Sequence, residues 1–209
     1  YAIFEDGNDN AEYGIEDFTF SSGFSDIAGV RIGFEGQRGP VQKDTIAHEE
    51  TSTAIQTGGT SITTDASLAV DTDGFYQAFV SIRDDIRSVN SVSGLGLDWG
   101  FETSAINTNG VRVELWTATG TPTVSQPVTA NFDDTVTTSS IAASRWSGVD
   151  IECTPVDAVQ TNTNNTAGWQ VTPTGTQSGD RIIGGAAIVV QTTNAPGVDD
   201  TEHSERSIG

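Results

Sequence analysis

Carboxylate and amide oxygens gather near the start of the chain in a pattern that favours a hard cation. Asp6, Asn8, Asp9 and Glu12 lie close together in one predicted loop. Oxygen atoms of Asp, Asn and Glu side chains are the ligands that calcium prefers in proteins. Their spacing differs from that of a helix-loop-helix calcium site, so an ordinary turn rich in Asn and Asp is the alternative. We therefore predict a calcium site at these four residues and leave that alternative open.

A second acidic pair, Asp71 and Asp73, stands in an Asp-x-Asp-Gly pattern directly before a predicted strand. Calcium takes about six to eight oxygen ligands, which two carboxylates cannot supply alone. Further oxygens would have to come from other acidic loops, such as residues 133–134 or 199–200. The pair predicts a second calcium site, and a turn that only caps the strand is the alternative.

The residue types that usually carry out catalysis are few and poorly spaced. His48 and His203 are the only histidines, and neither has the spacing of a zinc-binding pair. Cys153 is the only cysteine, so no disulfide can form within the chain. There is no Gly-x-Ser-x-Gly nucleophile elbow, and the Glu-x-Asp-x-x-Glu pattern of sandwich glycosidases is also missing. We predict that the protein is not an enzyme.

Two tryptophans, Trp99 and Trp116, are candidates for a sugar-binding surface, because an exposed indole ring can stack against a pyranose. In residues 111–116 the aliphatic side chains share one face of a predicted strand, which places Trp116 on the opposite face. Trp116 is exposed there unless a second layer of protein covers it. A place in the core is the alternative for both side chains.

The chain is strongly acidic. Asp and Glu number 29 against nine Lys and Arg, which gives a net charge of −20 over 209 residues. Such a surface repels phosphate backbones and anionic lipid headgroups, so we predict no nucleic-acid partner. We also predict no membrane insertion, since no apolar run approaches the roughly 18 residues of a membrane span. The balance resembles that of proteins from salt-loving or marine microbes, in which salt or calcium partly neutralises the carboxylates.

Alternation of apolar and polar residues predicts an all-β protein. Val30, Ile32 and Phe34 alternate with polar residues or glycine, and Asn109-Gly110 is a typical hairpin turn. Residues 181–190 are almost continuously apolar around Gly184-Gly185, which predicts a central strand with a bulge. Short strands separated by turn residues favour an antiparallel β-sandwich or jelly roll with long acidic loops. Strands are predicted around residues 30–34, 61–70, 76–82, 111–116, 128–132, 141–146, 169–172 and 181–191.

Three stretches of the sequence resemble a known class of domain. They are residues 88–120, residues 141–158 with a Ser-Gly-Val-Asp corner before a Pro-Val-Asp turn, and residues 179–190. In this order they resemble a jelly-roll or concanavalin-like β-sandwich domain of phage and archaeal-virus structural proteins and of secreted prokaryotic surface proteins. The resemblance covers about residues 58–204 and implies a β-sandwich at the surface of a cell or virion. In such domains a further strand often follows the position of Glu205.

The first part of the chain fits that domain less well. We therefore divide the chain into an N-terminal extension with the first strands, residues 1–57, and a main β-sandwich, residues 58–209. The extension packs on the sandwich or extends it, and we expect one structural unit.

These observations together predict a non-enzymatic structural subunit, outside the cell or on a virion surface, that assembles with copies of itself or coats a larger particle. The apolar residues Tyr1, Ile3 and Phe4 and an unpaired C-terminal strand are the expected contacts, because unpaired edges invite strand addition. Asn164 starts an Asn-x-Thr sequon and is a predicted glycosylation site. The alternative is a calcium-supported carbohydrate-binding module or adhesin that recognises cell-surface glycans. Calcium is the one cofactor that either prediction includes.

Overall fold

The computed structural model describes residues 2–6, 27–34, 45–108, 110–151, 155–164, 174, 180–188 and 200–205. These ranges contain strands and turns but no helix, and so no helical segment there is long and apolar enough to span a membrane. The strands are β1 (Ala2–Asp6), β2 (Ile27–Phe34), β3 (Ala47–Thr57), β4 (Ser61–Thr63), β5 (Gly74–Ile82), β6 (Val89–Ser93), β7 (Gly100–Asn107), β8 (Val111–Gly120), β9 (Thr129–Phe132), β10 (Thr138–Ser147), β11 (Val156–Asn164), β12 (Arg181–Ile188) and β13 (Asp200–Glu205).

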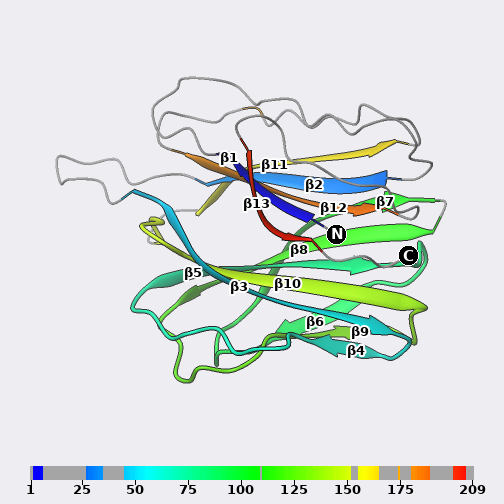
Figure 1. The fold of residues 1–209 in the computed structure, drawn as a ribbon, viewed down its shortest axis with the longest axis horizontal. Helices are drawn as coiled ribbons and strands as arrows, with labels where there is room; N and C mark the ends of the chain where they lie inside the picture. Colours follow the sequence, from blue (N-terminus) through cyan, green and yellow to red (C-terminus); the bar gives the residue numbers. More distant parts are fainter. Residues whose placement is uncertain are drawn as a thin grey trace.

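The strands form three layers (Figure 1). An outer sheet has the order β11-β2-β12-β1-β13, a central sheet has the order β3-β10-β5-β8-β7, and a small sheet has the order β4-β9-β6. The paired strands are antiparallel, which confirms the predicted all-β sandwich. The small sheet is a third layer that the sequence did not predict. The long acidic loops stay a prediction.

The central sheet is buried on both faces. Successive side chains of a strand point to opposite faces, so Phe75 and Phe79 of β5 pack toward the outer sheet, and Tyr76 and Val80 pack toward the small sheet. All nine residues of β5 are buried as a result. The predicted strand at residues 76–82 is confirmed, and its apolar-polar alternation, which alone would indicate one exposed face, does not reflect its burial on both faces. A second covering layer is the cause.

The strand β12 lies in the middle of the outer sheet, which confirms the predicted central strand. The bulge predicted at Gly184-Gly185 is wrong, because the pairing with β1 and with β2 continues through both glycines without a shift. The absence of a side chain at Gly185 allows close packing between the layers. A Cβ atom on Gly185 would lie 2.5 Å from Cδ1 of Phe79, so only glycine allows the outer sheet to approach that ring.

The local predictions differ in outcome. The hairpin after residue 107 joins β7 to β8, with the Gly110 amide donating to the Asn107 carbonyl at 3.0 Å and a positive φ at Gly110. The predicted strand 61–70 is only β4, after which Leu68 makes an isolated bridge to Gln126. The predicted strand 169–172 lies outside the described residues.

The two ends of the chain share the outer sheet. The N-terminal strands β1 and β2 alternate with the C-terminal strands β11, β12 and β13. The strand β3, which ends at Thr57, pairs with β10 in the central sheet. Residues on both sides of the predicted 57/58 boundary therefore belong to the same sheets.

Candidate functional site

Much of the first predicted calcium loop lies outside the described residues. Asp6 is the last residue of β1, and Asn8, Asp9 and Glu12 are not among the described residues. The metal prediction at these residues stays a prediction. In the part of the chain that the structure describes, no group of three or more His, Cys, Asp or Glu side chains is arranged to hold a metal ion.

The carboxylates of Asp71 and Asp73 have different partners. Oδ2 of Asp71 accepts a hydrogen bond from Nη1 of Arg145 at 2.6 Å. Oδ1 of Asp73 accepts one from the Thr121 hydroxyl at 3.3 Å, and the Asp73 amide donates to the same hydroxyl oxygen at 3.0 Å. Asp71 is thus paired with a cation of the chain itself, and Asp73 fixes a turn in which its own φ is 52°. The described contacts agree with the alternative of a turn at this pair.

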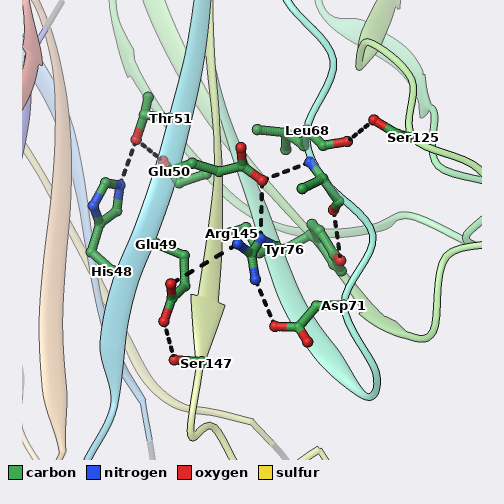
Figure 2. A network of polar contacts seen from close by, with 12 residues as sticks. His48, Glu49, Glu50, Thr51, Leu68, Asp71, Tyr76, Ser125, Arg145 and Ser147 are labelled. Carbon is green, nitrogen blue, oxygen red and sulfur yellow. Dashed lines mark hydrogen bonds and ion pairs between the residues drawn. The ribbon is translucent and has the colours of Figure 1, made fainter.

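Arg145 is the centre of a charged cluster on β3, β10 and the segment before β5 (Figure 2). Its guanidinium contacts Glu50 at 2.9 Å and Glu49 at 3.9 Å, in addition to Asp71. Glu50 lies directly opposite Arg145 in the ladder between β3 and β10, so the two side chains share a face. Oε1 of Glu50 also accepts the Ala69 amide at 2.6 Å. The cluster therefore ties the irregular segment between β4 and β5 to the central sheet.

The carboxylates of the charged cluster raise the pKa of Arg145. Burial lowers the pKa of the Arg145 guanidinium, but the hydrogen bond and charge of Glu50, together with those of Asp71, outweigh this and leave the pKa above its ordinary value. Only 16% of the Arg145 side chain is exposed. Arg145 therefore stays charged, and its role in the described geometry is to neutralise carboxylates.

A chain of hydroxyl groups leads from His48 into the sandwich, on the face of the central sheet that meets the outer sheet. Nε2 of His48 is 2.7 Å from the Thr51 hydroxyl, which is 2.7 Å from the Ser144 hydroxyl. The His48 ring also packs edge-on against Trp146 at 5.0 Å between ring centroids. Ser144 is fully buried, so a substrate could not reach its hydroxyl in this structure. The contacts connect β3 to β10 and do not form an accessible nucleophile.

The same face of the central sheet holds an unpaired amide. Gln77 lies on β5 opposite Ser144 on one side and Thr117 on the other. Gln77 is fully buried, and neither its side-chain oxygen nor its nitrogen has a hydrogen-bond partner among the described residues. Such a group costs stability unless water reaches it.

Trp116 is covered by the small sheet and does not offer the exposed ring that sugar stacking requires. Its side chain is 8% exposed and belongs to the core between the central and small sheets. Its Nε1 donates to Oε2 of Glu114 at 3.2 Å, and Phe101 packs edge-on against it at 5.5 Å. Trp99 is partly buried against the same core and donates from Nε1 to the Gly94 carbonyl at 3.2 Å. The carbohydrate-binding prediction relied mainly on Trp116, whose buried ring cannot stack against a sugar in this structure.

A buried carboxylate holds the neighbourhood of Trp116 together. Glu114 is 2% exposed and contacts Nη1 of Arg112 at 3.2 Å. Its Oε1 also accepts the Val89 amide at 3.1 Å. Glu114 therefore joins β8 in the central sheet to β6 in the small sheet and satisfies polar groups from both. Sequence analysis missed this residue, because a single Glu in a strand does not reveal what covers it.

The predicted assembly residues lie in a strand with two neighbours. Ile3 and Phe4 belong to β1, which pairs with β12 on one side and β13 on the other, and Tyr1 lies outside the described residues. Their backbone is not a free edge. The C-terminal strand β13 pairs with β1 and has no second neighbour among the described strands, and its role in assembly stays a prediction. Asn164 is the last residue of β11, and its glycosylation stays a prediction.

Exposed apolar side chains lie on both edge strands of the central sheet, with Phe101 and Ile106 on β7 and Ile55, 43% exposed, on β3. Phe101 is 52% exposed and Ile106 is 37% exposed, and β7 has a neighbour on one side only among the described strands. Glu102 is the one charged residue of this strand, and it accepts a hydrogen bond from the Thr117 hydroxyl. Edge strands usually carry lysine, proline or unpaired charges that prevent pairing with another chain. The absence of lysine and proline is no signal in this sequence, because none of the described strands contains either residue, and the strand order is needed to recognise an edge.

No protein-family model, curated protein or solved structure matches this chain. The resemblance to viral and secreted surface domains stays a prediction.

Proposed function

We propose that this chain is a non-enzymatic structural subunit that assembles with copies of itself through the β7 edge of its central sheet. The observation that carries the proposal is an apolar edge on a strongly acidic chain. Phe101 and Ile106 are exposed along β7, while the net charge of the chain is −20. Unpaired edge strands form hydrogen bonds with other strands readily, and burial of exposed apolar side chains makes the free energy of pairing more favourable.

The other edge of the central sheet is less suited to this role. The strand β3 exposes one apolar side chain, Ile55, where β7 exposes two. It also carries Glu49 and Glu50, and both carboxylates face Arg145 of their own chain. Two copies that paired along β3 in a register centred on these residues would bring the carboxylates together, which is unfavourable at short range. The β7 edge brings no such cluster to the contact.

Assembly of this kind depends on salt. Two copies of a chain with net charge −20 repel each other, and the range of that repulsion is about 10 Å at 0.1 M salt and about 3 Å at 1 M. The proposal therefore places the subunit in a saline environment, outside the cell or on the surface of a virion. The acidic composition and the sequence resemblance to viral and secreted surface domains support that location.

The test compares two charged variants of exposed apolar residues. Phe101→Lys places a charge on the β7 edge, and Val70→Lys places the same charge on an irregular segment where Val70 is 46% exposed. Both variants change the net charge by one unit, so any difference between them comes from position. We expect mass photometry at 1 M salt to show a lower mass for Phe101→Lys than for wild type, and an unchanged mass for Val70→Lys.

Equal masses for the two folded variants would contradict the proposal. Circular dichroism and thermal unfolding of each variant check that the fold is kept, since Phe101 also contacts Trp116. Ile106→Lys gives a second test on the same strand, because its side chain is exposed and lies opposite Arg112 rather than Trp116. If only Phe101→Lys lowers the mass and also lowers the unfolding temperature, the effect belongs to the fold and not to the edge.

A further inference from the structure

We infer that the assembly contact is a two-fold antiparallel pairing of β7 with β7 of a second copy, centred on Ser104. The inference rests on the proposed function and adds to it the symmetry, the register and the residues that meet. Its basis is the arrangement of three side chains along β7, an edge strand among the described residues, namely Phe101, Ser104 and Ile106.

A β-bulge in β7 brings these three side chains to one face. Phe101 and Ile106 are five residues apart, so in a regular strand they would point to opposite faces. The pairing with β8 shifts between Phe101 and Thr103, which leaves Glu102 as the extra residue. The partners of the three residues on β8 are Trp116, Glu114 and Arg112, which alternate along that strand. Directly opposite residues share a face, so the three β7 residues share one as well.

The spacing along this face is symmetric about Ser104. With Glu102 counted as the bulge residue, Phe101 lies two ladder positions before Ser104 and Ile106 lies two positions after it. A second β7 strand placed antiparallel about Ser104 therefore sets Phe101 opposite Ile106 of the other copy at both ends. The same three residues of each copy then form the contact, which is the requirement for a closed two-fold dimer.

The positions of the charged residues near β7 are compatible with a second copy of the chain pairing there. In this register Asp98, which precedes β7, lies beside the turn that follows Asn107 in the other copy, and residues 108–110 carry no charge. The carboxylate of Glu102 is engaged by Thr117 of its own chain. Two acidic chains can thus meet along the whole strand without placing one carboxylate directly opposite another.

Cysteine cross-linking tests the register. Residues opposite each other in an antiparallel pair have Cα atoms about 4.5 to 5.5 Å apart, within the range that a disulfide bridges. We expect Ser104→Cys, made together with Cys153→Ser, to form a disulfide-linked dimer under mild oxidation at 1 M salt. The control is Val70→Cys in the same Cys153→Ser background, which we expect to stay largely unlinked because Val70 lies outside the strands, in the segment between β4 and β5.

The outcomes separate this inference from the proposed function. A chain that assembles at high salt but gives no more cross-linked dimer with Ser104→Cys than with Val70→Cys overturns the pairing at Ser104 and leaves assembly in place. A chain that remains monomeric and unlinked overturns both. Cross-linking that is specific to Ser104→Cys and is lost when Phe101→Lys is added supports the pairing. A mixture of Phe101→Cys chains with Ile106→Cys chains, both in the Cys153→Ser background, should link at one end of the strand while each copy keeps one of its two apolar side chains.

Discussion

At the scale of single residues, burial determines how Tyr76 responds to pH. The ring lies in the core between the central and small sheets, and its hydroxyl donates to the Ala69 carbonyl at 3.3 Å. Burial raises the pKa of Tyr76 above its ordinary value of 10.0. The folded state therefore keeps the proton at a pH where the unfolded chain has begun to lose it.

The consequence is a loss of stability in alkali. The contribution of Tyr76 is fully present below about pH 10 and is lost as the pH rises through the raised pKa of the folded state. We expect the free energy of unfolding, measured with urea between neutral pH and strongly alkaline pH, to fall more steeply for wild type than for Tyr76→Phe. The other two tyrosines are common to both proteins. Parallel pH profiles of the two proteins would contradict this prediction.

At the scale of strands and sheets, Glu114 connects the small sheet to the central sheet, and its removal should lower the free energy of unfolding strongly. Its carboxylate holds the Val89 amide of β6, Arg112 of β8 and the indole of Trp116. Removing one partner of a buried pair leaves the other charge unpaired, which costs about 3 to 5 kcal/mol. We expect Glu114→Ala to lower the free energy of unfolding by that amount in a urea titration.

An exposed glutamate serves as the control for Glu114. Glu49 is 36% exposed and 3.9 Å from Arg145, so Glu49→Ala should cost less than about 1 kcal/mol. A similar small loss for both variants would mean that Glu114 does not join the small sheet to the central sheet.

The strands themselves were largely predictable, whereas their layering was not. The alternation in residues 111–116 and the Asn-Gly turn before them are local features, and both the strand and the hairpin are confirmed. The burial of Trp116 depends on β4, β6 and β9, which are short and distant in sequence from one another. No local sequence pattern indicates that these three strands form a sheet that covers one face of the central sheet.

The candidate site was harder to predict for the same reason. Asp71 has the sequence pattern of a metal ligand, yet its partner Arg145 lies 74 residues away. The free edge of β7 depends on the strand order, and the common face of Phe101 and Ile106 depends on a bulge that only the pairing with β8 reveals. The dependence on salt that the proposal uses rests on composition and stays a prediction.

At the scale of the whole molecule, charge and open edges act against each other. The net charge of −20 keeps copies apart, while the β7 edge offers backbone groups and apolar side chains to a second strand. Screening by salt weakens only the first of these effects, because hydrogen bonds and apolar contacts at short range are little affected by ions. The state of the protein should therefore change with ionic strength rather than with the removal of a cofactor.

The most direct test of self-assembly is the mass of the wild-type chain in solution, measured by light scattering from 0.1 M to 1 M salt. A chelator is included in a parallel series, so that the effect of screening is separated from that of calcium. The account predicts a mass that rises from one chain of 21.9 kDa at low salt to dimers or larger assemblies at high salt, with or without the chelator. A monomer at every salt concentration would contradict it.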